Sequence, residues 1–274
     1  MASVNDYIET NRAHWDEVVR LHAASEFYDV PSFKAGRSTL LAVERTEVGD
    51  VRGKTLLHLQ CHFGMDTLSW AREGAIVTGV DFSPAAISTA RALASELGIE
   101  ARFVESNIYD LPKVLAGSFD IVFASYGVVC WLPDFPAWAR IAASYVKPGG
   151  FFYLIDGHPL FAAIDDDAKT EGLRLLYPYL TTGVPQPYPE VDGSYAAMDA
   201  KLEHRETTDF THDLGEVVTS LIQCGLQLEF LREWPLCAWQ ALPKMTRSDD
   251  DYWRLPESEP AVPFMYSLRA RKPA

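Results

Sequence analysis

The chain has 274 residues, of which 48% are hydrophobic and 23% are charged, a balance typical of a globular protein with one large domain or a core domain with an insertion. No run approaches the roughly 18 apolar residues that cross a bilayer, which argues against an integral membrane protein. The formal net charge of −14 argues against a nucleic-acid binder, which needs a basic face for the phosphates. A small neutral or cationic molecule is the easier partner for so acidic a surface.

The cysteines indicate a reducing compartment. They lie far apart and form no C-x-x-C pair: Cys61, Cys130, Cys224 and Cys237. This spacing favours buried thiols over a disulfide framework or a zinc site. His58 and His62 span a strand end and a loop instead of sharing one helical face, so we expect no metal there. Residues 1–6 lack a basic stretch followed by an apolar one, so we expect a cytoplasmic protein.

Residues 1–50 show helical periodicity in two segments, Val4–Ala23 and about Arg37–Glu47, which an aromatic turn joins. Residues 52–156 then alternate short apolar runs with helical patterns, which is typical of a parallel α/β sheet. The predicted strands of this part are Thr55–Leu59, Ala75–Val80, Ala101–Val104, Phe119–Ala124 and Phe151–Ile155. The helices expected to connect them include Asp66–Arg72, Pro84–Leu97 and Pro136–Tyr145.

The helix that begins at Pro84 has the clearest boundaries in the chain. Ser83 is a good N-cap residue, Pro84 suits the first helical position, and Gly98 stands where a glycine commonly ends a helix. These signals place a strand-to-helix turn directly after the second predicted strand.

The remaining chain divides into a cap and the end of the core. Residues 157–200 lose clear periodicity and fill with Pro, Tyr and Gly, which indicates a functional lid or an inserted cap. A helix is predicted again at Asp213–Cys224, and two closing strands follow at Leu226–Glu233 and Phe264–Arg271. We therefore divide the chain into an N-terminal helical cap (1–50), a core (51–156), an inserted substrate cap (157–211) and a C-terminal part of the core sheet (212–274).

Ligands of open α/β sheets bind at the carboxyl ends of the strands, where the strand order reverses. The turn after the first predicted strand contains Gly64, and Asp81 ends the second strand 17 residues later. An acid at that place accepts hydrogen bonds from the hydroxyls of a ribose, and Phe82 beside it is suited to lie against a purine ring. The alternative role for Asp81 is a charge at a helix N-terminus, although Ser83 already supplies the cap.

Several stretches resemble, in order, the class I S-adenosylmethionine-dependent methyltransferases. These stretches are KTLLHLQCHFGMDTLSWAREGA, VTGVDFSPAAISTAR, ARFVESNIYDLP, FDIVFASYGVVCWLPD and VKPGGFFYLID. The first of them and the C-terminal DLGEVVTSLIQCGLQLEFLREWP are similar to a bacterial small-molecule group whose first motif reads LHLQCHFG. The resemblance covers about four fifths of the chain and is weakest over residues 157–211.

This resemblance implies a doubly wound, Rossmann-like α/β sheet with strand order 3-2-1-4-5-7-6, and S-adenosylmethionine as the cofactor, with S-adenosylhomocysteine as its product. It assigns to the cofactor Gln60, Cys61, His62, Gly64, Asp81, Phe82, Asn107, Ile108 and Ser125. The first motif departs from the usual pattern, because only its last glycine, Gly64, is present. Gln60 and His62 replace two others, and His58 stands in place of an acid.

The methyl acceptor is expected under the two cap segments, which are rich in aromatic side chains. Aromatic walls suit a planar or cationic molecule and favour a sulfonium charge, although ordinary packing under a cap also explains them. The expected substrate-binding residues are Tyr7, Trp15, Tyr28, Phe33, Trp131 and Tyr195.

A protein base is needed only if the acceptor must lose a proton. The candidates are Asp156 and His158 at the end of the fifth predicted strand, and His212 before the last core helix. Each also has a structural alternative, as a polar residue that fixes a loop or a helix end. Tyr126, at the end of the fourth strand, completes the set of catalytic candidates and is expected next to the sulfonium.

The sequence therefore favours an enzyme that transfers a methyl group to the carbon, nitrogen or oxygen of a small, aromatic or nitrogen-containing metabolite by in-line displacement. The lost glycines suggest an alternative, a degenerate methyltransferase fold that binds a cofactor or partner without turnover. A nicotinamide-dependent reductase is disfavoured because Gln60 and His62 would crowd a pyrophosphate. We expect neither nucleic acid nor membrane as a partner, and a monomer or homodimer; the acceptor atom stays open.

Overall fold

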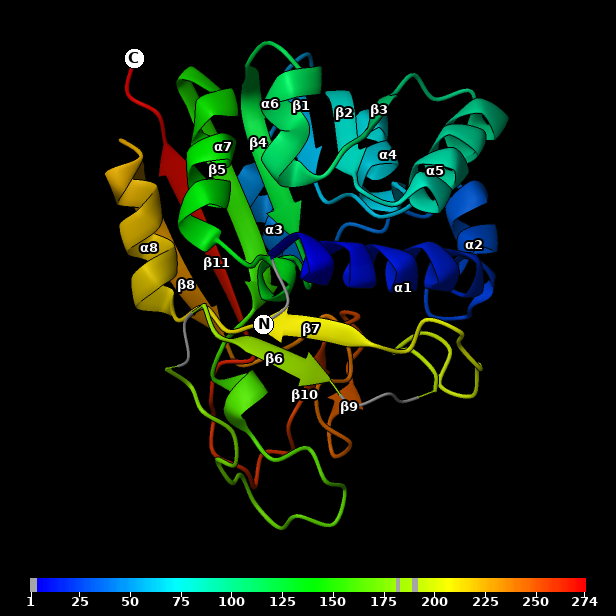
Figure 1. Cartoon of the computed structure of the whole chain (residues 1–274), viewed down its shortest axis with the longest axis vertical. Coiled ribbons are helices and arrows are strands. Elements are labelled where there is room, and N and C mark those ends of the chain that lie inside the picture. Colours follow the sequence, from blue (N-terminus) through cyan, green and yellow to red (C-terminus); the bar gives the residue numbers. More distant parts are fainter. Residues whose placement is uncertain (1–3, 181–182, 189–191) are drawn as a thin grey trace.

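The computed structural model describes residues 4–180, 183–188 and 192–274. Its centre is a seven-stranded sheet with the order β3-β2-β1-β4-β5-β11-β8 (Figure 1). Strands β1 to β5 run parallel, whereas β11 runs antiparallel to both of its neighbours. The strands are β1 Thr55–Leu59, β2 Ile76–Asp81, β3 Arg102–Glu105, β4 Phe119–Ser125, β5 Val146–Gly157, β8 Gln227–Trp234 and β11 Met265–Arg271. The predicted doubly wound α/β class is confirmed, with β8 and β11 as the sixth and seventh strands of the sheet along the chain.

Helices cover both faces of this sheet (Figure 1). They are α1 Val4–Ala24, α2 Val30–Lys34, α3 Ala42–Val48, α4 Met65–Arg72, α5 Pro84–Leu97, α6 Leu111–Val114, α7 Phe135–Tyr145 and α8 Leu214–Gln223. Short 3-10 helices lie at η1 Ile108–Asp110, η2 Val129–Trp131 and η3 Phe161–Ala163. Because side chains alternate along a strand, β4 packs on both layers. Its Val122 lies in one buried cluster with residues of α7 and α8, and its Phe123 lies in another with Trp70 of α4.

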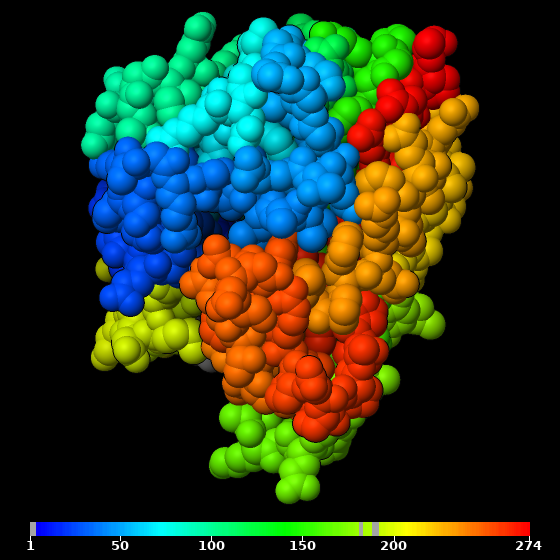
Figure 2. All heavy atoms as spheres, turned by 180° about the vertical axis from the view of Figure 1, so that it is seen from behind, coloured from blue at the N-terminus to red at the C-terminus, as the bar shows by residue number. Residues whose placement is uncertain are grey.

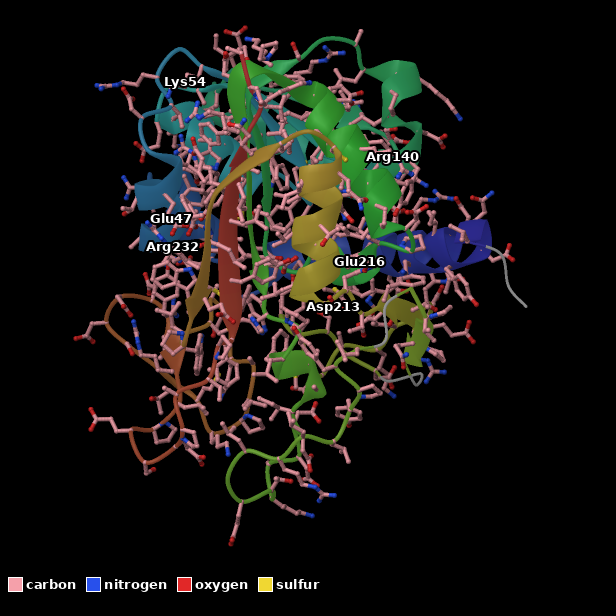
Figure 3. The ribbon with its side chains drawn as sticks, turned by 90° about the vertical axis from the view of Figure 1, so that its left-hand side faces the viewer. Glu47, Lys54, Arg140, Asp213, Glu216 and Arg232 are labelled. Carbon is pink, nitrogen blue, oxygen red and sulfur yellow. The ribbon has the colours of Figure 1, made fainter. Side chains whose placement is uncertain are left out.

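Local signals set the boundaries of the best predicted helices. The Ser83 hydroxyl accepts the Ala86 N–H at 3.0 Å, and Gly98 ends α5 with a φ of 64°. At α8, the Asp213 carboxylate accepts the Glu216 N–H at 2.9 Å, and Figure 3 shows both residues at the start of this helix. These hydrogen bonds satisfy backbone donors that a helix N-terminus leaves free.

The N-terminal segment differs from the prediction in two places. The helix expected from about Arg37 begins only at Ala42, because Thr39 is tied to α4: its N–H and its hydroxyl contact Ser69 Oγ at 3.1 and 3.0 Å. The aromatic turn before it contains the short helix α2, which the sequence prediction missed. Asp29 caps that helix by accepting the Ser32 N–H at 3.2 Å.

Two small sheets lie outside the main one. Strands β6 Pro185–Tyr188 and β7 Thr207–Phe210 pair in the inserted segment, and β9 Thr246–Arg247 pairs with β10 Trp253–Arg254 between β8 and β11. Seen from behind, the segment between β8 and β11 (orange in Figure 2) lies against the N-terminal segment (blue). The Val43 N–H donates to the Tyr252 hydroxyl at 3.0 Å across this contact, and nearby Arg232 of β8 reaches Glu47 of α3 (Figure 3).

Over the described residues, no helix combines the length and the apolar character that crossing a bilayer requires.

Candidate functional site

A cavity of about 110 Å³ lies at the carboxyl ends of β1, β2, β3 and β4, beneath α1 and part of the inserted segment. Ten residues that the sequence assigned to the site line it: Gln60, His62, Asp81, Phe82, Asn107, Ile108, Tyr126, Trp15, Trp131 and Tyr195. Its other lining residues are Ile8, Asn11, Val80, Ser106, Tyr109, Gly127, Val128 and Leu132. The cavity thus occupies the strand ends at which open α/β sheets bind their ligands.

The turn after β1 keeps a left-handed backbone although two of its glycines are replaced. Gln60 and His62 adopt φ values of 54° and 50°, a region that costs non-glycine residues free energy. The Gln60 side chain compensates by accepting the indole N–H of buried Trp138 at 2.9 Å. Gly64 is required both by its φ of 82° and by space, since a Cβ there would lie 2.7 Å from the Phe103 ring.

Asp81 is the charged group of the cavity. It ends β2 and is buried, and its two carboxylate oxygens accept the N–H groups of His62 at 2.8 Å and Ser83 at 2.9 Å. Burial raises the pKa of Asp81 to about 6, while these backbone donors act in the opposite direction. Each carboxylate oxygen retains a lone pair for a ligand hydroxyl.

The end of the cavity next to β3 has an apolar character. Ile108 is buried, and Phe82 follows Asp81 on the cavity wall. Asn107 begins η1, and its Oδ1 accepts the Tyr109 N–H at 3.1 Å, which holds this wall in place. The arrangement offers a flat ligand apolar contacts beside the Asp81 carboxylate.

Three predicted cofactor residues lie around the cavity instead of lining it. Ser125 ends β4, and its Oγ lies 3.5 Å from His58 Nε2 and 3.4 Å from Asp66 Oδ2. Burial lowers the pKa of His58 to about 3, so the imidazole is neutral, with Nδ1 2.8 Å from the Thr67 hydroxyl. The others are buried Cys61, whose thiol pKa burial raises well above its usual value, and Gly64.

Tyr126 joins the cavity to a buried acid that sequence reasoning missed. Its hydroxyl donates to Glu44 Oε2 at 2.7 Å, and the Glu44 side chain is fully buried at the start of α3. Burial raises the pKa of Glu44 to about 7, although its hydrogen bonds with Tyr126 and the Leu41 N–H oppose the shift. Glu44 lies 82 residues before Tyr126, and no local pattern in the sequence marks it.

Helix α1 and the inserted segment form one cap over the cavity. Asn11 holds Thr208 by two hydrogen bonds of 2.8 Å, from its amide to the Thr208 carbonyl and from the Thr208 N–H to its oxygen. His22 contacts the Ser194 hydroxyl at 2.7 Å and His62 Nε2 at 3.0 Å. Burial lowers the pKa of His22 to about 4. Two segments that are distant in sequence therefore close the site together.

Aromatic side chains make up much of this cap. Trp15 packs edge-on against Trp131 and His62, with ring centroids 5.3 and 5.4 Å apart. The hydroxyl of Tyr195 is hydrogen-bonded to that of Tyr28, which stacks on His22 outside the cavity lining.

Two predicted substrate residues contact other parts of the protein. Phe33 is 1% exposed and belongs to a buried cluster between α1, α4 and α5. Tyr7 packs edge-on against Phe210 of β7, with ring centroids 5.9 Å apart, and does not line the cavity. Both positions correct the expectation that these rings face a substrate, because Phe33 packs against the core and Tyr7 packs against the other cap segment.

Asp156 is a structural group at the end of β5. It is buried and accepts four backbone N–H groups, from Gly127, Val128, Val129 and Gly157. Burial raises its pKa, and these donors oppose the shift. The carboxylate thereby fixes the loop after β4 and does not face the cavity, contrary to the expectation that it would act there as a base.

The two histidine candidates are also engaged elsewhere. His158 Nδ1 accepts the Leu160 N–H at 3.0 Å, so its Nε2 carries the proton that it shares with Glu233 Oε1 at 2.9 Å. His212 contacts Glu216 Oε2 at 2.7 Å and the Leu132 carbonyl at 2.6 Å. Neither ring lines the cavity, and neither has a nitrogen left for a substrate, which corrects the prediction that they face the cleft.

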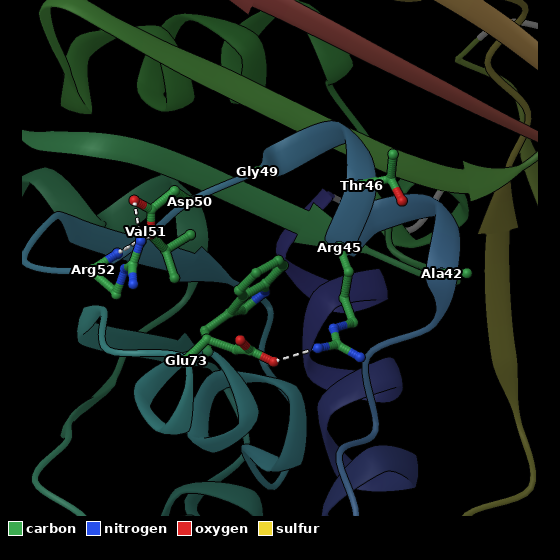
Figure 4. A pocket seen from close by; sticks show the side chains of 9 residues that line it. Ala42, Arg45, Thr46, Gly49, Asp50, Val51, Arg52 and Glu73 are labelled. Carbon is green, nitrogen blue, oxygen red and sulfur yellow. Dashed lines mark hydrogen bonds and ion pairs between the residues drawn. The ribbon is translucent and has the colours of Figure 1, made fainter.

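A second hollow, of about 500 Å³, lies at the other end of the sheet (Figure 4). It lies between α3 and the C-terminal end of α4, next to the residues that lead into β1. Arg45 and Glu73 form an exposed ion pair of 2.8 Å across it, as Figure 4 shows. The amino-terminal end of a parallel sheet is not where such folds bind ligands, so we place the functional site in the smaller cavity.

Comparison with known proteins agrees with this geometry. Residues 56–150 match the family model described as "Methyltransferase domain", which covers β1 to the middle of β5 and about a third of the chain. The "Ubiquinone biosynthesis O-methyltransferase" of Cronobacter sakazakii is 32% identical over 122 residues, which are 44% of this chain and 47% of that protein. The chain thus spans about half the length of the curated relatives it matches.

Solved structures show the same fold at low sequence identity. An S-adenosylmethionine-dependent methyltransferase from Mesorhizobium loti has a TM-score of 0.59 at 20% identity, covering 84% of this chain and 98% of that one. Another from Clostridium acetobutylicum has a TM-score of 0.55 at 12% identity, covering 97% and 100%. The fold is that of the Rossmann-like class I methyltransferases.

Proposed function

We propose that this chain is an S-adenosylmethionine-dependent methyltransferase that acts on a small molecule. The observation that carries the proposal is the cavity at the ends of β1, β2 and β4, where the Asp81 carboxylate lies between an apolar wall and the turn after β1. The family match spans the strands that build this cavity. The turn after β1 supports the proposal as well, because Gln60 and His62 adopt a left-handed backbone although they stand at positions where the usual first motif has glycines.

The cavity residues fit the chemical groups of this cofactor. Asp81 is the acceptor for the two ribose hydroxyls, and Phe82, Asn107 and Ile108 form the adenine end. Among the described residues that line the cavity, none is Lys or Arg, so no fixed positive side chain opposes a sulfonium. The aromatic rings of Trp15 and Trp131 favour a cation further.

The bound cofactor would supply an electrophilic methyl group, to which an acceptor aligned opposite the C–S bond would form its new bond while S-adenosylhomocysteine leaves. Tyr126 is the catalytic residue that we propose, because it lines the cavity and its hydroxyl donates to Glu44. A proton that the acceptor loses passes to the Tyr126 oxygen while the Tyr126 proton moves to Glu44. A carboxylate with a pKa of about 7 suits this role near neutrality.

The acceptor we propose is a small, aromatic or nitrogen-containing molecule without an anionic group. The aromatic cap, the acidic cavity and the overall charge of −14 support this choice. In this proposal, the core segments 51–156 and 212–274 bind the cofactor, and the cap segments 1–50 and 157–211 cover the acceptor. O-methylation is the reaction named for the ubiquinone relatives, and an oxygen nucleophile is one that needs the Tyr126–Glu44 pair.

Calorimetric titration with S-adenosylmethionine and S-adenosylhomocysteine tests the proposal directly. We expect micromolar binding of both, and at least tenfold weaker binding by Asp81→Ala, which lacks the ribose acceptor. Asp110→Asn is the matched control, since Asp110 is exposed, forms an ion pair with Lys113 at 2.6 Å and is not one of the described residues that line the cavity. Absence of binding by the wild type would refute the proposal and favour a methyltransferase fold without turnover. Wild-type affinity in Asp81→Ala would refute the role of Asp81.

A further inference from the structure

Two buried polar groups, one on the cap and one on the core, have no hydrogen-bond partner. They are Oδ1 of Asp209, on β7 of the inserted segment, and the hydroxyl of Tyr266, on β11 of the main sheet, and both lack a partner among the described residues. The Tyr266 side chain is also deeply buried, with 1% of the residue exposed. Buried polar atoms are nearly always paired in folded proteins, so an unpaired one is a candidate contact for a ligand.

The carboxyl group of Asp209 is the more costly of the two to bury. No ion pair or hydrogen bond is found for it in the part of the chain that the structure describes, and burial alone raises its pKa to about 7. Burying a carboxylate without a cation costs free energy, and this side chain holds no other described group in place that would offset the cost. Its position therefore favours a ligand that carries a positive charge.

Asp209 and Tyr266 lie around one residue of the loop after β4, Cys130. Strand β7 packs against the short helix η2, which contains Cys130. Burial raises the pKa of the Cys130 thiol, and the nearby charges of Asp209 and Asp156 raise it further. Burial also raises the pKa of Tyr266, with smaller contributions from Asp156, its direct neighbour between β11 and β5, and from Cys130. The two unpaired groups thus belong to one cluster.

This cluster adjoins the cavity on the side of the proposed catalytic residue. Tyr126 lies at the start of the loop that contains Cys130, and Val128 and Trp131, on either side of Cys130, both line the cavity. One of the unpaired groups belongs to the cap and the other to the core, so a ligand that opens the cap at this loop would reach both. An acceptor with its nucleophile at Tyr126 can extend along the loop toward the cluster.

We propose that the Asp209 carboxylate and the Tyr266 hydroxyl bind an ammonium group of the methyl acceptor, away from the atom that is methylated. An ammonium group has three N–H donors and a positive charge, so it can donate to both oxygens at once. This rests on the proposed function and narrows its acceptor to an aromatic molecule with an aliphatic amine. Asp209 and Tyr266 then determine specificity for the acceptor and do not contact the cofactor.

The test compares amines with neutral molecules of the same shape, on protein saturated with S-adenosylhomocysteine. The pairs are tyramine with para-propylphenol and tryptamine with propylindole, in which a methyl group replaces the ammonium group. Calorimetry at about pH 8, where aliphatic amines are charged, measures them against wild type, Asp209→Asn, Tyr266→Phe and Asp110→Asn. The wild type compared with both members of a pair gives the effect of the ammonium group even if a variant does not fold.

We expect the wild type to bind at least one amine about ten- to hundredfold more tightly than its neutral partner, as for hydrogen bonds to a charged group. Asp209→Asn should remove this preference, Tyr266→Phe should reduce it about three- to tenfold, and Asp110→Asn should keep it. Thermal unfolding should give Asp209→Asn and Tyr266→Phe a Tm at least as high as that of the wild type, because each removes a buried group without a partner.

The pH dependence adds a readout that a structural role would not produce. Asp209 is charged above its pKa of about 7, so amine affinity should be about tenfold weaker at about pH 6 than at about pH 8. The other titratable groups that face the pair are Cys130, Asp156 and His158, whose ring packs edge-on against Tyr266. Asp209→Asn keeps these groups, so its residual amine affinity should not change over this range.

Three results would overturn the assignment alone. They are a wild type that binds S-adenosylhomocysteine but prefers neither amine to its neutral partner, a preference or pH dependence that persists in Asp209→Asn, and a Tm well below that of the wild type in both variants. A wild type that does not bind S-adenosylhomocysteine would overturn the proposed function with it.

Discussion

Replacing Asp156 by asparagine should lower the free energy of unfolding, because Asp156 is a structural group and not a base in methyl transfer. Oδ2 accepts the N–H groups of Val128 at 2.9 Å and Val129 at 2.8 Å, and Oδ1 accepts those of Gly127 at 2.5 Å and Gly157 at 2.7 Å. Asp156→Asn keeps the shape of the side chain but turns one of these oxygens into an amino group. Two buried N–H donors then lose their acceptor and face another donor.

The size of this effect follows from the hydrogen bonds that are lost. Each buried donor without a partner costs about 1–3 kcal/mol, so two cost about 2–6 kcal/mol. Removing the buried charge offsets part of this, because burial raises the pKa of Asp156. We therefore expect a net loss of about 2–4 kcal/mol in the free energy of unfolding, or a decrease in Tm of roughly 5–15 °C for a chain of this size.

Thermal and urea unfolding, followed by circular dichroism, measure this change, with Asp110→Asn as the surface control that should stay within about 0.5 kcal/mol of wild type. S-adenosylhomocysteine binding, measured well below the transition, reports on the cavity wall next to the loop. An Asp156→Asn protein with the wild-type Tm and no methyl transfer would show that Asp156 is a chemical group and that our assignment is wrong.

Three further predictions concern the cavity. The Asp81 carboxyl accepts ribose hydroxyls most strongly, and with both oxygens, when it is ionised, so S-adenosylhomocysteine affinity should fall as the pH drops through the pKa of about 6, by up to tenfold per unit, and calorimetry of Asp81→Asn should show a flat profile. Gln60→Gly relieves about 1 kcal/mol of left-handed strain, but it leaves the buried Trp138 N–H without its acceptor and increases the backbone entropy of the unfolded chain. Urea unfolding should therefore show a free energy of unfolding that is lower by about 1–2 kcal/mol, and a higher value would contradict the anchoring role of Gln60. Glu44→Gln should lower methyl transfer at neutral pH at least tenfold and remove its dependence on a group of pKa about 7, with the S-adenosylhomocysteine Kd unchanged; an unaltered pH profile of transfer would exclude the Tyr126–Glu44 pair.

The sequence predicted the elements whose signals are local. Helix α5 is an example, because Ser83, Pro84 and Gly98 specify its ends through hydrogen bonds and backbone angles within a few residues. The start of α3 was misplaced because contacts with α4 hold Thr39 in an extended segment, and propensity does not report such contacts. The place of β11 between β5 and β8 followed from the resemblance and not from its own residues.

The candidate site was predictable where a residue's position along its strand determines where it lies in the fold. Positions at strand ends, such as Asp81 and Tyr126, were found because the topology of an open sheet brings those ends together. The same rule also selected Asp156 and His158, but their side chains turn to partners that only the folded chain provides. Glu44 was missed for the converse reason, since it approaches the site from a helix that carries no motif.

The cap shows why the cavity depends on two distant segments. Asn11 and Thr208 lie 197 residues apart, yet two hydrogen bonds join them, and a further contact links His22 to Ser194. The cavity measures about 110 Å³, whereas pockets that enclose small molecules measure roughly 300–1,000 Å³. A ligand as large as a nucleoside therefore has to displace part of this cap. The two segments are hydrogen-bonded to each other as well as to the core, so a ligand that displaces one also displaces the other. The free energy of moving the N-terminal helix therefore contributes to the ligand affinity.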